Sequence, residues 1–391
     1  MDDHPVKARS KLLLFTLRAL LVVLSIEIPS RLAGEYLART GFFYTPPESL
    51  RLADYLAYGR EPDVGWLPRP EVDAVGARKL PAFPDPATPA CVTLYGDSFA
   101  WSDEVDDEHT WANVLARRAG CRVTNYGVAG YGTDQAYLHY LHNGFDRTRI
   151  AVLGVLAENV IRNVNQYRRL LSHRTALTLK PRFLLDERGA LRLVPVPGKG
   201  EAEVRAIVSR PEDNLPFDYF VPGGPSGVQR LHFPYSLSLL GLFGDYRIRA
   251  RLHHRSYYQE LLAPDHPSRA VPITAAIARA FHDEALKRGA TPVAVLIPLV
   301  DDLREQRRTG VMPYHGLGEA LDRAGITTLD AGPPLAEALA GRDPCALYTR
   351  CTLGHFNEEG YRLMGEITQR FLAERGMLGA EAPKAALDPA R

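Results

Sequence analysis

Short apolar runs alternate with amphipathic segments along the chain from residue 90 onward. The short runs are rich in Val, Ile, Leu and Thr and predict strands, at 92–95, 123–125, 150–156, 291–297 and 327–329. Between and after them, apolar residues recur at helical spacing, at 110–118, 134–142, 273–288, 316–324, 334–339 and 360–374. This alternation predicts an α/β fold, a three-layer sandwich with a central parallel sheet and helices on both faces.

The alternation is interrupted between residues 170 and 265. Residues 180–185 and 190–194 flank Asp186-Glu187-Arg188-Gly189, which is the signature of a β-hairpin. Residues 195–225 show no regular pattern, and an apolar helix is predicted at 236–242. Long irregular segments in compact folds are often functional. We therefore interpret this partly β insertion as a lid or cap beside the active site. The alternative is an insertion without a functional role, far from that site.

The N-terminus carries an apolar stretch from Leu12 to Ile28, preceded by basic residues and interrupted by Arg18 and Glu27. The pattern predicts a signal-anchor helix over residues 1–31, with the chain start in the cytoplasm. A cleaved signal peptide and a surface amphipathic helix are the alternatives. Arg18 opposes spanning, because a mid-helix Arg costs roughly 2.5–3.5 kcal/mol on insertion scales, and the run is shorter than the usual span of about 20 residues.

The remaining boundaries follow from composition. Residues 32–89, rich in Pro, Asp and Arg toward their end, are interpreted as a linker, with Trp66 as a packing anchor. Residues 90–376 are interpreted as the folded domain. The Ala- and Pro-rich residues 377–391 are expected to be a disordered tail.

The chain has 47 basic and 46 acidic residues, so there is no basic surplus to suggest nucleic-acid binding. No metal motif stands out, no cofactor is implied, and the acidic run at 103–108 is interpreted as a solvated loop.

Four segments carry candidate chemistry. The first, 92–100, is a strand that ends at Gly96-Asp97-Ser98, a turn that could lift a serine out of the end of a parallel sheet. By itself this is also ordinary turn chemistry. Three further segments follow in chain order, at 123–135, 151–159 and 355–361. Together the four resemble the SGNH (GDSL) hydrolase family, and the flanking pattern looks like its bacterial membrane-anchored branch.

The resemblance implies a role for one residue in each segment. Ser98 is the nucleophile, and His355 is the general base that a serine hydroxyl needs in order to react. The Ser98 and Gly130 N–H groups and the Asn159 side-chain amide form the oxyanion hole. Alternatively, Asn159 could form a turn at the strand end, and His355 could simply begin a helix.

The orienting acid is missing from its usual place. The family carries an Asp two or three residues before the His, where this chain has Leu353 and Thr352. Asp330 and Asp343 precede His355 in the chain and are candidates for that role. A backbone carbonyl is the alternative, and it would make the site a Ser-His dyad.

The four cysteines are expected to form disulfides Cys91–Cys121 and Cys345–Cys351. The first two begin strands expected to be neighbours, the second two flank the turn before the His segment, and an even count outside the cytoplasm favours pairing. Four buried thiols in a cytosolic protein are the alternative.

The resemblance implies a serine-dependent acyl or acetyl esterase in the cytoplasmic membrane. The membrane would be crossed once, with the catalytic domain in the periplasm, and the substrate would be a carbohydrate or cell-envelope ester. An O-acyltransferase for a glycan would share the chemistry. A non-catalytic binding protein with a decayed site is the alternative from another class.

Overall fold

The computed structural model describes residues 4–47, 52–66, 72–144, 148–173, 175–253, 255–352 and 354–378. The chain divides into two compact units. The N-terminal unit comprises residues 1–53, 167–177 and 198–257, and the sheet unit comprises 54–166, 178–197 and 258–391. Leu353 and nearly all of the predicted tail lie outside the described residues.

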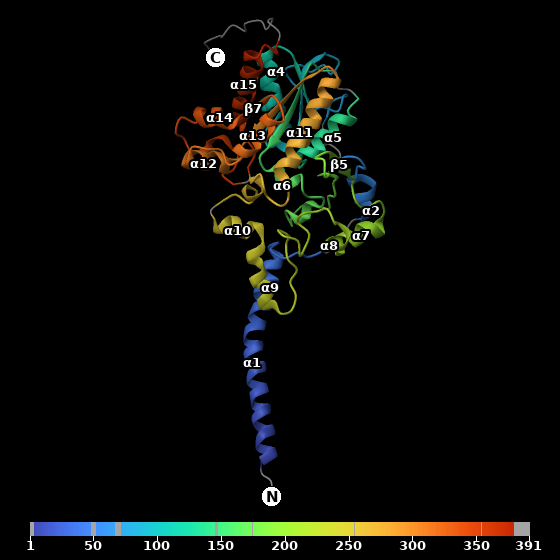
Figure 1. Ribbon diagram of the computed structural model, residues 1–391. Helices are drawn as coiled ribbons and strands as arrows, with labels where there is room; N and C mark the ends of the chain where they lie inside the picture. Colours follow the sequence, from blue (N-terminus) through green and yellow to red (C-terminus); the bar gives the residue numbers. More distant parts are fainter. Residues whose placement is uncertain are drawn as a thin grey trace. The chain divides into compact units, whose positions relative to one another are not determined.

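The sheet unit is built on five parallel strands in the order β2-β1-β3-β6-β7 (Figure 1). They are β1 (Ala90–Tyr95), β2 (Arg122–Asn125), β3 (Ile150–Leu156), β6 (Thr291–Ile297) and β7 (Thr328–Asp330). The predicted α/β fold with a central parallel sheet is confirmed. Because β1 lies between β2 and β3, the chain reverses direction across the sheet there. Such a switch point opens a crevice at the carboxyl ends of the strands.

Helices cover both faces of this sheet (Figure 1). One group contains α4 (Trp111–Ala119), α12 (Val300–Thr309), α14 (Gly332–Ala338) and α15 (Glu358–Glu374). The other contains α5 (Thr133–His142), α11 (Ala270–Lys287) and α13 (His315–Arg323). The sequence pattern missed α12, whose only buried apolar residues are Val300 and Leu303. Short helices α3 (Ser98–Trp101) and α6 (Asn159–Arg162) complete the unit, and the division of the chain into units falls within α2 (Leu52–Asp54).

The predicted insertion contributes to both units. Its hairpin, β4 (Arg182–Leu185) with β5 (Leu191–Val194), is antiparallel as expected and belongs to the sheet unit. Residues 198–257 belong to the N-terminal unit and contain α7 (Glu201–Ser209), α8 (Pro211–Asn214), α9 (Tyr235–Gly241) and α10 (Tyr246–Leu252). The expectation of irregular structure at 195–225 is therefore wrong over α7, which buries Val204, Ile207 and Val208 at helical spacing.

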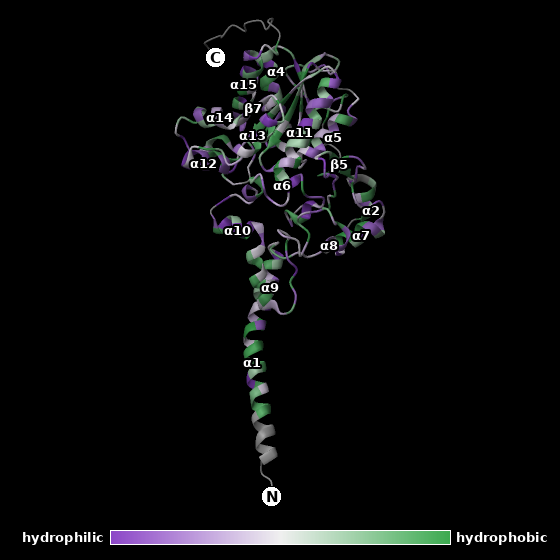
Figure 2. Ribbon diagram, in the orientation of Figure 1, coloured by the Kyte–Doolittle hydropathy of each residue, from purple (hydrophilic) through white to green (hydrophobic). Residues whose placement is uncertain are grey.

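The N-terminal unit begins with α1 (His4–Arg39), which continues past the predicted boundary at residue 31 and contains Pro29. Its segment Leu12–Arg39 is long and apolar enough to cross a membrane, with a mean hydropathy of 2.1 over an 18-residue window. Figure 2 colours much of this helix as hydrophobic. Length and composition alone do not separate an anchor from a signal sequence, so the cleavage state stays a prediction.

The structure contains two disulfides in the sheet unit. Cys91–Cys121 joins β1 to the residue before β2, and Cys345–Cys351 closes a loop of the chain shortly before His355. The first bond fixes the two strands whose far ends carry candidate site residues. The second limits the freedom of the loop that carries the candidate base.

Candidate active site

The candidate nucleophile lies at the end of β1. Ser98 is the first residue of α3, and the Asp97 carboxylate caps this helix by accepting the Phe99 N–H at 2.9 Å. Gly96 is required by close packing, since a Cβ there would lie 2.7 Å from Ala100 Cβ. The φ angle at Gly96 is not positive, so the glycine is needed for close packing and not for a left-handed backbone.

His355 lies beside the serine. Its Nε2 is 2.8 Å from Ser98 Oγ, within reach for removing the hydroxyl proton. The imidazole packs on Phe99 with ring centroids 5.0 Å apart, so the nucleophile's helix also supports the base. The His355 carbonyl accepts the Thr349 N–H at 2.9 Å, which holds the loop closed by the second disulfide.

A carboxylate faces the other imidazole nitrogen, and it comes from the loop after the nucleophile. Glu104 Oε2 lies 3.6 Å from His355 Nδ1. The same carboxylate accepts the Thr349 hydroxyl and pairs with the Arg350 guanidinium. Nδ1 is buried and forms no hydrogen bond with any residue that the structure describes. The ion-pair distance is longer than a hydrogen bond, as is common in active sites without substrate.

Glu104 has two properties expected of a functional carboxylate. Its backbone is left-handed, with φ of 70°, a conformation that costs a non-glycine residue roughly 1–2 kcal/mol. Burial opposes its ionisation, but the Thr349 hydroxyl, His355 and Arg350 outweigh burial and lower the pKa of the Glu104 carboxyl. A lowered pKa means that the carboxyl group is ionised throughout the neutral range. It loses its negative charge, by protonation, only in acid.

The acids suggested by the sequence have other partners. Asp330 Oδ1 accepts the Tyr314 hydroxyl at 2.7 Å and the Gly332 N–H at 2.9 Å. Asp343 Oδ1 accepts the Cys345 N–H at 2.8 Å. Sequence reasoning missed Glu104 because the acidic run containing it has the composition of a solvated loop. Its only local signal is a position six residues after Ser98, close enough for one loop to carry both.

Two further candidate groups follow the neighbouring strands. Asn159 opens α6 directly after β3 and is fully buried, yet neither side-chain atom, Nδ2 or Oδ1, has a hydrogen-bond partner among the described residues. Buried amides are normally paired, so an unpaired one calls for a ligand. Gly130 follows β2 with φ of 81°. Trp66 holds this turn, because its Nε1 donates to the Ala129 carbonyl at 3.1 Å and its carbonyl accepts the Tyr131 hydroxyl at 2.6 Å.

Arg162, at the end of α6, joins the segments that carry these groups. Its Nη1 donates to Asp97 Oδ2 at 3.1 Å and to the Tyr131 carbonyl at 3.0 Å, and its Nη2 donates to Glu158 at 2.9 Å. Burial raises the pKa of the Asp97 carboxyl, and the Arg162 charge opposes that rise. Asp97 therefore belongs to a buried ionic network and not to the reacting groups. Among the described residues, no group of three or more His, Cys, Asp or Glu could hold a metal ion.

Comparison with known proteins gives structural neighbours only. No family model matches the chain, and no curated protein does. Solved structures of GDSL-type lipolytic proteins and acetylxylan esterases are similar to it. A G-D-S-L family lipolytic protein from Desulfitobacterium hafniense is 13% identical over 73% of this chain and 100% of its own, with a TM-score of 0.34. The acetylxylan esterase Axe2 from Geobacillus stearothermophilus is 10% identical over 75% and 96%, with a TM-score of 0.38.

A third neighbour is LAE5, an α/β hydrolase from the metagenome of Lake Arreo, Spain. It is 10% identical over 75% of this chain and 98% of its own, with a TM-score of 0.38. The GDSL resemblance predicted from the four sequence segments is thus found among these neighbours, whereas the membrane-anchored branch stays a prediction. Such low identities and TM-scores leave the function to be argued from the geometry of the site.

Replacing Glu104 by Gln should lower kcat by about 10²–10⁴-fold, the range for a general base whose proton transfer is impaired. The Gln keeps the shape of the side chain but removes the charge that favours imidazolium. The acid limb of the pH–rate profile should therefore move to lower pH. Steady-state kinetics across the pH range on an acetyl ester would measure both changes.

The matched control is Asp343→Asn, which also neutralises one acid near this loop and should leave kcat and the pH profile close to wild type. The opposite result, a large loss in Asp343→Asn with a normal Glu104→Gln, would place the orienting acid elsewhere.

Replacing Asn159 by Ala should lower kcat by about 10²–10³-fold, the usual cost of removing one oxyanion donor. Because the amide has no partner among the described residues, its removal should leave the midpoint of thermal unfolding nearly unchanged. Kinetics and thermal unfolding of the same preparation separate the two effects. A normal kcat with a lowered midpoint would show that Asn159 is structural.

Proposed function

We propose that the protein is a serine-dependent ester hydrolase acting through Ser98 and His355. The observation that carries the proposal is the 2.8 Å distance between His355 Nε2 and Ser98 Oγ at the carboxyl end of β1. A serine hydroxyl is a weak nucleophile, and an adjacent imidazole is the usual way to activate it. The Glu104 carboxylate 3.6 Å from Nδ1 supports the assignment, since it favours the imidazolium formed during attack.

The reaction proceeds in two stages. Ser98 Oγ forms a bond with the acyl carbon while Nε2 of His355 takes the hydroxyl proton. The ester C–O bond then breaks, and the leaving alcohol receives that proton from the imidazolium. Water attacks the acyl-enzyme in the same manner, which releases the acid and restores the serine. Asn159 Nδ2, with the N–H groups of Gly130 and Ser98, would donate to the oxyanion in both stages.

We also place this activity outside the cytoplasm, with α1 as an anchor in the cytoplasmic membrane. The residues from Leu12 to Ile26 are all exposed, as those of a lipid-facing helix would be. Two disulfides fit an oxidising compartment. The substrate class, an acylated carbohydrate or cell-envelope glycan, rests on the resemblance of the four sequence segments to SGNH hydrolases.

A fluorophosphonate probe should label the wild-type chain and not Ser98→Ala, because the serine oxygen displaces fluoride from phosphorus. Hydrolysis of p-nitrophenyl acetate should fall at least about 10³-fold in the same variant. Ser209→Ala is the matched control: this serine is exposed on α7, and its loss should change neither result. Labelling that survives in Ser98→Ala, or none in wild type, would refute the assignment. Acyl transfer to an added glycan in preference to water would make the enzyme a transferase.

A reporter that is active only outside the cytoplasm, fused after Gly376, should give a signal in cells. The reason is the excess of basic residues before the apolar run, which keeps the chain start in the cytoplasm. A cytoplasm-only reporter at the same position is the control and should be silent. A signal from the cytoplasm-only reporter alone would show that the part of the chain after α1 lies in the cytoplasm.

A further inference from the structure

The N-terminal unit has large apolar side chains on its surface around α9. Phe233, Leu237, Leu240 and Phe243 are each 60–65% exposed. Leu237 and Leu240 are three residues apart and therefore lie on the same helical face. Together with the turn that follows α9, residues Tyr235–Gly244 form a short apolar helical segment.

The orientation of this segment is inverted relative to a helix on a water-soluble protein. Such a helix directs its apolar face inward and its polar face to solvent. In α9 the polar Ser238 is buried, and its hydroxyl donates to the His232 carbonyl at 2.8 Å. Leucines point outward instead. An outward apolar face is favourable where the surroundings are hydrocarbon.

α9 lies against α1, the helix proposed as the membrane anchor (Figure 1). Glu27 of α1 is only 8% exposed, and its carboxylate accepts the Tyr235 N–H at 2.5 Å and the Ser236 hydroxyl. About two turns further along α1, Gly34 is so close to Leu231 that a Cβ would lie 2.5 Å from the Leu231 Cδ1. The one acid within the apolar stretch of α1 is thus shielded by the start of α9.

Apolar side chains of α1 are exposed in the region where this helix contacts α9. Ile28 and Leu32, which lie between Glu27 and Gly34 in the sequence, are 56% and 63% exposed. On α9, Leu237 and Leu240 are exposed as well. Any bilayer that covers the second half of α1 would therefore also reach α9.

We propose that α9 is a second membrane-contacting element, inserted among the lipid acyl chains beside α1. The inference rests on the proposed anchor and extends it. Ten helical residues are too few to cross a bilayer, which requires about 20, so α9 would lie at the interface and not span. In this arrangement the Glu27 carboxylate is satisfied by backbone and hydroxyl donors at a depth where water is scarce.

Basic residues follow α9 in the chain. Arg247 and Arg251 both lie on α10, and Arg247 pairs with Asp245 at 2.7 Å. Arg251 is exposed, and it precedes Leu252, which is 59% exposed. Cationic side chains beside an apolar helix are typical of interfacial segments that meet anionic lipids.

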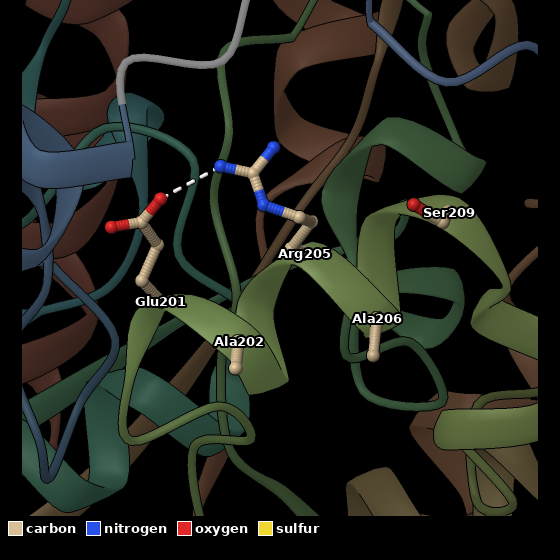
Figure 3. A pocket seen from close by; sticks show the side chains of 5 residues that line it. All are labelled: Glu201, Ala202, Arg205, Ala206 and Ser209. Carbon is tan, nitrogen blue, oxygen red and sulfur yellow. Dashed lines mark hydrogen bonds and ion pairs between the residues drawn. The ribbon is translucent and has the colours of Figure 1, made fainter.

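Single-cysteine labelling of the full chain tests the proposal. The four native cysteines are paired in disulfides, so an introduced cysteine can be labelled selectively. The variants are Leu240→Cys on α9, Leu21→Cys on α1 and Ala202→Cys on α7. Ala202 is the matched control, since it is exposed beside the Glu201–Arg205 ion pair on a polar face of the same unit (Figure 3). Each cysteine variant is labelled with an environment-sensitive dye. It is then placed in vesicles of phosphatidylethanolamine and phosphatidylglycerol whose acyl chains carry nitroxide labels.

We expect the nitroxide to quench the Leu240 dye several-fold more than the Ala202 dye, with the Leu21 dye quenched as well. Equal quenching at Leu240 and Ala202, with the Leu21 dye quenched, would overturn the role of α9 and leave the anchor standing. An unquenched Leu21 dye would reject the anchor and, with it, the arrangement of α9 beside an inserted α1. Ser98 labelling by the fluorophosphonate, measured in the same vesicles, reports separately on the proposed enzyme function.

Discussion

A buried guanidinium organises the candidate site. Arg162 is only 7% exposed, and an unpaired charge at such a position would cost several kcal/mol. Its acceptors come from three segments: Asp97 after β1, the Tyr131 carbonyl after β2 and Glu158 after β3. The charge can be satisfied only when these three strand ends hold fixed positions relative to one another. Those ends also carry Ser98, Gly130 and Asn159, the proposed nucleophile and oxyanion donors, so the folding requirement and the geometry of the candidate site are the same constraint.

A second buried charge extends this constraint to the hairpin. The Lys180 ammonium, fully buried, binds Asp134 at 2.5 Å and also donates to the Arg162 carbonyl at 3.0 Å. Removing either member of such a pair would leave an uncompensated charge in the interior, which typically costs 3–5 kcal/mol. Lys180 lies just before β4, so the chain that enters the hairpin also holds α6, the helix that begins with Asn159. A segment that looks like an insertion in the sequence is part of the support of the site.

The sheet was predictable because buried elements have a recognisable local sequence pattern. Each buried strand is a run of apolar residues, and in most covering helices the apolar residues recur at helical spacing. Ser98 and His355 were predictable because their neighbours form recognisable segments. Glu104, Arg162 and Lys180 were not predictable, since a charged residue in a loop or a short helix has the same local pattern whether it is solvated or buried against a partner distant in the chain. α7 was missed for a different reason: its apolar spacing is present but lies within a Pro- and Gly-rich region.

The position of Glu104 changes how the catalytic groups are coupled. In the pattern that the sequence resembles, the acid and the base share one loop, so they move together relative to the serine. Here the acid shares a loop with Ser98, and the base comes from a separate loop. Glu104 also binds Thr349 and Arg350 on that second loop. In the proposed mechanism the carboxylate supplies the charge that favours imidazolium. Its contacts with Thr349 and Arg350 also join the loop that carries His355 to the loop that follows Ser98. The left-handed backbone at Glu104 is the local strain that this arrangement requires.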